Sequence, residues 1–199
     1  PQMVINWKAN SYVPSGFAGK AFPTAESSVA AALIMTENGK LVNLAGQTIY
    51  WYVNENFIGG GPGISRIVFD APIVAPNNID LRAKLPDYKG SMLIENITIP
   101  VVNPEVALQA PFPNGRFRGS SARLTVLPLF FNVKSMENLT FTWIANGQSF
   151  SDTEDPDHLN LNLTSDTIPG STIAIAITVK NPIRYGDAAS ARTVLTFTE

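Results

Sequence analysis

The sequence has no cysteine and a single histidine, His158, among its 199 residues. The absence of cysteine excludes disulfides, thiolate metal sites, cysteine nucleophiles and dithiol redox motifs. One histidine leaves little room for a catalytic dyad, a catalytic triad or a histidine-rich metal site. None of the serines lies in a Gly-x-Ser-x-Gly motif. We therefore expect that this protein is not an enzyme.

Charged residues are also scarce, at 15% of the chain against about 25% in an average globular protein. The 14 Lys and Arg residues and the 16 Asp and Glu residues leave a net charge of −2. Without clustered cations the chain is a poor partner for nucleic acid. No apolar run approaches the roughly 18–20 residues of a membrane span. The 45% hydrophobic content is nevertheless enough to build a core, which excludes a disordered chain.

Apolar and polar residues alternate with period two along most of the sequence, which is typical of half-buried β-strands. The alternating runs are short, rich in β-branched residues and separated by Gly, Pro, Asn and Asp. The Ala-rich residues 29–35 have no helix cap and no amphipathic continuation, so we expect a strand there too. The pattern predicts an all-β chain. The clearest alternating runs are residues 5–9, 79–85, 159–163 and 173–179.

Two tryptophans, Trp51 and Trp143, lie 92 residues apart in similar sequence surroundings. A period of roughly 90–100 residues corresponds to one β-sandwich domain rather than to a solenoid repeat. Each half shows about seven short strands with its tryptophan on a central one, the pattern of an immunoglobulin-like sandwich. We predict two tandem immunoglobulin-like β-sandwich domains, residues 1–102 and 103–199, with Trp51 and Trp143 as buried core anchors.

The segment 143–147, Trp-Ile-Ala-Asn-Gly, resembles the third strand and its turn in bacterial Ig-like and PKD-like modules. Residues 4–14, 19–24 and 37–40 resemble uncharacterised bacterial cell-surface proteins that carry such modules in tandem. The resemblance implies an Ig-like architecture and an extracellular or cell-surface location. It implies no catalytic residues and no cofactor.

Exposed aromatic residues are the best candidates for a binding face. Tyr50 and Tyr52 alternate with Trp51 and should share the outward face of its strand. Trp7, in the first strand, is the third candidate. Such a face could bind a glycan or a protein partner, and the same residues could equally be there because aromatic side chains favour strands.

The most acidic stretch carries Asp152, Glu154, Asp155 and Asp157, whose oxygens could bind Ca²⁺. The spacing is not that of an EF-hand and the stretch has no turn glycine, so a solvated loop is expected instead. His158 is interpreted as a residue of a strand edge or surface. The glycine-rich residues 59–63 lack the helix and the Lys-Ser/Thr of a phosphate-binding loop and are expected to form a mobile loop. No metal or cofactor is expected.

Together these features predict a non-enzymatic extracellular structural protein, such as a surface stalk, an adhesin or a filament subunit. The alternative is a secreted module that binds a glycan or another ligand. Sandwiches leave open sheet edges, and scarce charge leaves few edge guards here. We therefore expect the chain to self-associate, with a terminal strand taking part by strand addition.

Overall fold

The computed structural model describes residues 1–198 apart from residues 76, 111 and 151–154. Within that range nearly all regular structure is β-strand, which confirms the predicted all-β class. The described residues contain no helix that is long and apolar enough to cross a membrane. The Ala-rich residues 29–35 lie in a strand, as predicted. The strands are β1 (Gln2–Ala9), β2 (Ser28–Glu37), β3 (Lys40–Leu41), β4 (Thr48–Val53), β5 (Asn56–Pro62), β6 (Arg66–Asp70), β7 (Asn77–Tyr88), β8 (Ser91–Val101), β9 (Glu105–Gln109), β10 (Arg116–Phe117), β11 (Ser121–Leu129), β12 (Thr140–Ala145), β13 (Gln148–Phe150), β14 (His158–Asn162), β15 (Thr172–Lys180) and β16 (Ala188–Phe197), and the 3-10 turns are η1 (Pro113–Gly115) and η2 (Met136–Asn138).

The chain divides into two compact units. Unit 1 consists of Pro1–Ser11 and Gly19–Asn103, and unit 2 consists of Tyr12–Ala18 and Pro104–Glu199. The short segment Tyr12–Ala18 thus belongs to unit 2, whereas the sequence pattern grouped it with residues 1–102.

This segment is held in unit 2 by backbone hydrogen bonds and by ring contact. The Tyr12 N–H donates to the Phe131 carbonyl at 2.7 Å, and the Phe130 N–H donates to the Tyr12 carbonyl at 2.7 Å. The ring of Phe17 meets Phe130 edge-on, with centroids 5.9 Å apart. The segment therefore adds an isolated β-bridge, Tyr12 to Phe131, to unit 2. No local sequence pattern predicts this pairing.

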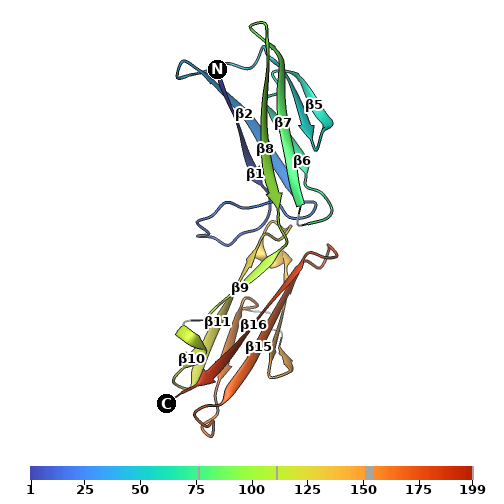
Figure 1. The fold of residues 1–199 in the computed structure, drawn as a ribbon. Coiled ribbons are helices and arrows are strands. Elements are labelled where there is room, and N and C mark those ends of the chain that lie inside the picture. Colours follow the sequence, from blue (N-terminus) through green and yellow to red (C-terminus); the bar gives the residue numbers. More distant parts are fainter. Residues whose placement is uncertain (76, 111, 151–154, 199) are drawn as a thin grey trace. The chain divides into compact units, whose positions relative to one another are not determined.

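Unit 1 is a sandwich of two antiparallel sheets. In one sheet β2 pairs with β1 on one side and with β3 and β6 on the other; the second sheet has the order β5-β4-β7-β8 (Figure 1). Alternate side chains of both sheets meet in one apolar core that includes Ile5, Leu33, Trp51 and Leu81. The other side chains of each strand form the two outer faces, which are available for binding.

Unit 2 repeats this plan with sheets β14-β11-β9 and β10-β16-β15-β12-β13. Its core gathers Phe117, Leu124, Phe131, Trp143 and Ile177. The pairing between β10 and β16 is parallel, while the other paired strands in these two sheets are antiparallel.

The first and last strands lie in the sheets of their own units. β1 pairs with β2 over its whole length, from Gln2 opposite Thr36 to Ala9 opposite Val29. β16 pairs with β15 in the same continuous way. Each terminal strand is thus an integral part of a sandwich, and its removal would expose the core beneath it.

Each unit is built around one buried tryptophan on an interior strand. Trp51 on β4 is 0% exposed and Trp143 on β12 is 1% exposed. The indole Nε1–H of Trp51 donates to the Ile64 carbonyl at 2.8 Å, and that of Trp143 donates to the Pro156 carbonyl at 2.9 Å. In both units the acceptor lies 13 residues after the tryptophan. Each indole therefore fills the core and also ties a distant loop to it.

Replacing either tryptophan by alanine is expected to lower the free energy of unfolding of its unit by about 3–5 kcal/mol, because a large aromatic site is emptied. Urea denaturation followed by circular dichroism measures this loss. Tyr185→Ala is the matched control: the Tyr185 side chain is fully exposed, so its loss should change stability by at most about 0.5 kcal/mol. A cost below about 1 kcal/mol at Trp51 or Trp143 would contradict their role.

Candidate functional site

A row of aromatic side chains lies on the outer face of the β5-β4-β7-β8 sheet of unit 1. Tyr50 and Tyr52 flank the buried Trp51 on β4, and Phe57 lies opposite Tyr52 on β5. The Phe57 ring meets both tyrosine rings edge-on, with centroid separations of 6.1 Å to Tyr50 and 5.7 Å to Tyr52. Phe57 is 59% exposed, so an apolar ring faces solvent here. We call Tyr50, Tyr52 and Phe57 the aromatic row.

Gly60 makes the position of Tyr50 in this row compatible with the sheet. A Cβ atom at Gly60 would lie 2.5 Å from the Ile49 carbonyl oxygen and 2.6 Å from Cδ1 of Tyr50. The expectation that residues 59–63 form a mobile loop is wrong for most of that stretch, since residues 59–62 belong to β5. Pairing with β4 outweighs the low strand propensity of glycine, and the absence of a side chain at Gly60 admits the Tyr50 ring.

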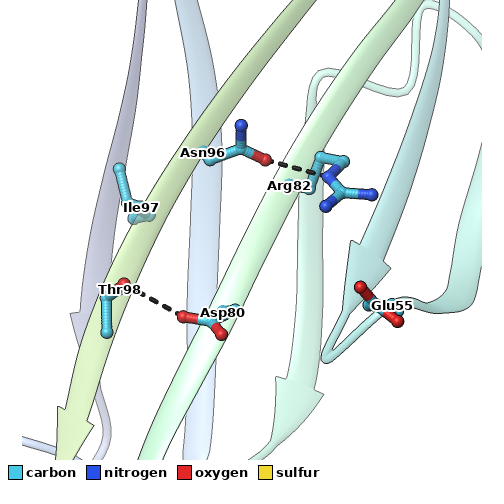
Figure 2. A pocket seen from close by; sticks show the side chains of 6 residues that line it. All are labelled: Glu55, Asp80, Arg82, Asn96, Ile97 and Thr98. Carbon is cyan, nitrogen blue, oxygen red and sulfur yellow. Dashed lines mark hydrogen bonds between the residues drawn. The ribbon is translucent and has the colours of Figure 1, made fainter.

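A polar hollow of about 220 Å³ adjoins the aromatic row. Arg82 on β7 donates from Nε to Oδ1 of Asn96 on β8 at 2.9 Å. Thr98 on β8 donates from its hydroxyl to Oδ1 of Asp80 on β7 at 3.0 Å. Figure 2 shows these two pairs side by side, with Glu55 reaching in from the β4–β5 turn. The hollow is lined by Glu55, Asp80, Arg82, Asn96, Ile97 and Thr98.

Strand register places the aromatic row and the polar hollow next to each other. Tyr52 lies opposite Arg82, and Arg82 in turn lies opposite Asn96. Tyr50 lies opposite Lys84 one step further along the same face. Ring surface and hydrogen-bonding groups thus follow one another across three strands. The hollow itself carries two carboxylates, Glu55 and Asp80, and one guanidinium, so it offers donors and acceptors with little net charge.

Both units hold the turn after the tryptophan strand in the same way. The Asp80 N–H donates to the Asn54 side-chain oxygen, and the Asn54 N–H donates to the Asp80 carbonyl, both at 2.9 Å. In unit 2 the same reciprocal pair joins Asn146 and Ala174, again at 2.9 Å for both bonds. These bonds identify corresponding positions in the two sheets.

The two units differ at the second residue of this turn, which is Glu55 in unit 1 and Gly147 in unit 2. The β4–β5 turn has Asn54 and Glu55 at φ 46° and 68°, and the β12–β13 turn has Asn146 and Gly147 at φ 48° and 81°. Asn-Gly is the preferred pair for a hairpin turn with two positive φ angles. Glutamate at the second position costs conformational energy. Unit 1 therefore keeps a strained glutamate where the turn favours glycine, and that glutamate lines the polar hollow.

The corresponding face of unit 2 is apolar. A hollow of about 490 Å³ lies at the matching place, beside the β12–β13 turn. Where unit 1 has Tyr52, Asp80 and Arg82, the registers of unit 2 place Ile144, Ala174 and Ala176. The aromatic row and the polar hollow are features of unit 1 alone among the described residues. The unit 2 hollow is lined by Ile144, Gly147, Ala174, Ile175, Ala176, Arg192, Thr193 and Val194.

Trp7 lies apart from the aromatic row, on the β1-β2-β3 sheet. Its side chain packs against the core of unit 1 on the same side of β1 as Ile5. The Lys20 ammonium lies 3.5 Å from the ring centroid, and the Phe22 ring lies 6.1 Å away. Burial lowers the pKa of Lys20 below its usual value. Trp7 is therefore partly covered and does not extend the binding face.

The acidic stretch forms a second candidate site, in unit 2. Of the predicted residues, Asp152 and Glu154 lie outside the described residues. Asp155 and Asp157 come together with His158, and their ligand atoms all lie within 4.8 Å of one another. The turn at 155–158 produces this cluster, because it brings residue 158 back to residue 155. His158 begins the strand β14, in line with the expected strand-edge position, but the sequence pattern did not indicate that its ring meets both carboxylates.

No family model and no curated protein matches this sequence. Solved structures do resemble its fold. The three N-terminal domains of the Highly Immunogenic Outer Capsid protein (Hoc) of bacteriophage RB49 match 98% of this chain and 59% of theirs, at 10% identity and a TM-score of 0.50. The fibronectin(III)-like modules of Clostridium thermocellum CbhA match 94% and 92%, at 12% identity and a TM-score of 0.34.

The D0-D1 domain of intimin matches 100% of both chains at 14% identity and a TM-score of 0.31. At such identities the likeness concerns the fold alone. The chain spans about three fifths of the Hoc fragment it resembles. The predicted fold class is confirmed by the sheets themselves: the protein is all-β, with two immunoglobulin-like sandwiches.

Replacing Glu55 by glycine is expected to raise the free energy of unfolding of unit 1 by about 0.5–1 kcal/mol, because glycine adopts positive φ without strain. The reciprocal change Gly147→Glu is the matched control, and it should lower the stability of unit 2 by about 1 kcal/mol. Urea unfolding of the two variants measures both effects. A destabilised Glu55→Gly variant would show that Glu55 serves the fold and not a site.

Proposed function

We propose that this protein is a non-enzymatic extracellular or bacterial cell-surface module whose first unit binds a carbohydrate. The observation that carries the proposal is the aromatic row, Tyr50, Tyr52 and Phe57, set in register with the polar hollow. Its two Ig-like units are proposed to be tandem copies of one module, of which only the first carries this face.

The chemistry of the face suits a neutral sugar. One side of a pyranose ring presents C–H groups that pack on aromatic carbon, and its rim presents hydroxyls that donate and accept. Phe57 supplies exposed ring surface. Carboxylate, amide and guanidinium groups of Asp80, Asn96 and Arg82 supply directed partners for adjacent hydroxyls.

The charges in the hollow favour such a ligand over an ionic one. The two carboxylates, Glu55 and Asp80, are balanced by Arg82 and the neighbouring Lys84, so the charges select neither an anionic nor a cationic ligand. The strained backbone of Glu55 supports a binding role for this turn, because a turn selected for stability alone would carry glycine at that position.

Binding is best measured by screening the intact chain on immobilised glycans and then titrating soluble oligosaccharides by calorimetry. Trp51 and Trp143 are buried, and Trp7 lies in the other sheet of unit 1, so intrinsic tryptophan fluorescence is a poor reporter. Phe57→Ala is expected to weaken binding about tenfold or more, because stacking surface is lost; each tenfold is about 1.4 kcal/mol. Phe150→Ala, at an exposed phenylalanine of unit 2, is the matched control and should leave affinity unchanged.

Two further variants sharpen the test. Arg82→Ala should weaken binding, and Glu55→Gly should weaken it while stabilising unit 1. If no glycan binds, or if Phe57→Ala and Phe150→Ala bind equally well, the carbohydrate-binding proposal fails.

Self-association, with a stalk or filament role, is the second candidate function. It is supported by the outer face of unit 2, where the apolar side chains of Ile144 and Val194 are 37% and 56% exposed. The occupant we propose for this face is a second copy of the chain, because Arg192 is the one charged side chain among the residues that line its hollow.

Analytical ultracentrifugation over a wide concentration range should then show oligomers. Val194→Lys should shift the equilibrium toward the monomer by placing a charge in the contact. Val68→Lys, at a valine of unit 1 that is 68% exposed, should not. A wild-type chain that stays monomeric at high concentration would rule this function out.

A further inference from the structure

The turn that precedes β14 brings three metal-ligating side chains to one point in unit 2. It is closed by a hydrogen bond from the His158 N–H to the Asp155 carbonyl at 3.1 Å. The Val126 N–H binds the Asp157 carbonyl at 2.8 Å, and the buried Trp143 indole binds the Pro156 carbonyl at 2.9 Å. The backbone of the turn is therefore fixed to the sheet and to the core.

The side chains of this turn converge on one ring nitrogen. Nδ1 of His158 lies 2.9 Å from Oδ1 of Asp155 and 3.1 Å from Oδ1 of Asp157. This nitrogen is buried, yet it makes no directed hydrogen bond within the described residues. A ring N–H would have to point at one of the two oxygens, and neither lies where such a bond requires it.

These separations match the ligands of a small divalent cation. Metal–nitrogen and metal–oxygen bonds of about 2.0–2.2 Å set adjacent ligand atoms roughly 3 Å apart. Imidazole together with carboxylate is a donor set for transition metals, whereas Ca²⁺ and Mg²⁺ take oxygen ligands. The acidic stretch alone suggested Ca²⁺, whereas the addition of His158 favours a transition metal.

The surroundings of the cluster orient its ligands. Arg123 binds Oδ2 of Asp155 at 2.7 Å, which leaves Oδ1 turned toward His158. Outer-shell partners of this kind commonly fix the ligands of metal sites.

We propose that Asp155, Asp157 and His158 form a binding site for a divalent transition-metal cation of the Zn²⁺ or Mn²⁺ class. Nδ1 of His158 and one oxygen of each aspartate are the protein ligands, and water completes the coordination. The two carboxylates balance the charge of the ion, and Arg123 limits how much further negative charge gathers there. The site is independent of the carbohydrate-binding face of unit 1.

Calorimetric titration of the chelator-treated intact chain with ZnCl₂ or MnCl₂ tests the proposal. Since His158 is the sole histidine, its imidazole ¹⁵N NMR signals report on the site without ambiguity. We expect the Nδ1 signal to shift on addition of ZnCl₂ and to broaden on addition of MnCl₂, because Mn²⁺ is paramagnetic. Because loss of an outer-shell partner alone costs about 10- to 100-fold in affinity, His158→Gln and Asp157→Asn should weaken binding by about 100-fold or more.

Glu105→Gln, at an exposed acid of the same unit, is the matched control and should bind like the wild type. Thermal melts of every variant in chelator establish that each one is folded. The proposal is overturned if millimolar metal leaves the Nδ1 signal unchanged, if His158→Gln binds as tightly as the wild type, or if CaCl₂ binds more tightly than ZnCl₂ and MnCl₂. A signal that responds to pH alone would assign the cluster to a shared proton instead.

Discussion

A buried indole must find an acceptor for its N–H, and both units of this protein are organised around that requirement. Trp51 and Trp143 fill their cores and donate to the carbonyls of Ile64 and Pro156. With the indole fixed inward, strand alternation turns the neighbouring side chains Tyr50 and Tyr52 outward. In unit 2 the accepting carbonyl belongs to the turn that carries the proposed cation ligands. The proposed carbohydrate site of unit 1 thus lies on the outer face of the strand that carries Trp51, and the proposed cation site of unit 2 lies at the turn whose carbonyl binds Trp143.

The two sandwiches show how one framework carries different surfaces. The reciprocal hydrogen bonds of Asn54 and Asn146 hold equivalent turns, while the outer faces beside them diverge. Unit 1 has tyrosine and charged residues where unit 2 has isoleucine and alanine. Exposed positions change at little cost to stability, because packing in the core does not constrain them. The exception is Glu55, where unit 1 keeps a strained turn residue beside its polar hollow.

Much of the fold could be predicted from the sequence, because alternation and turn residues are local signals. They gave the all-β class, the strand at residues 29–35 and the importance of the two tryptophans. The polar hollow could not be predicted, since it depends on which residues of β7 and β8 lie opposite each other across the ladder. The glycine-rich strand was missed because its pairing with β4, and not its own propensity, decides its conformation. The contact of His158 with Asp155 and Asp157 could not be predicted, because the turn that brings residue 158 back to residue 155 is seen only in the three-dimensional structure.

The segment Tyr12–Ala18 sets a condition on the order in which the protein can mature. During synthesis this segment leaves the ribosome long before Phe130 and Phe131, the residues that bind it. Domains generally fold as they emerge, starting from the N-terminus. Unit 1 therefore has to fold while the segment Tyr12–Ala18 still lacks its hydrogen-bond partners, which are supplied only when unit 2 has formed. Unit 2, for its part, cannot be produced complete as a contiguous fragment that begins at Pro104, because its segment Tyr12–Ala18 precedes strands β2 to β8 of unit 1 in the chain.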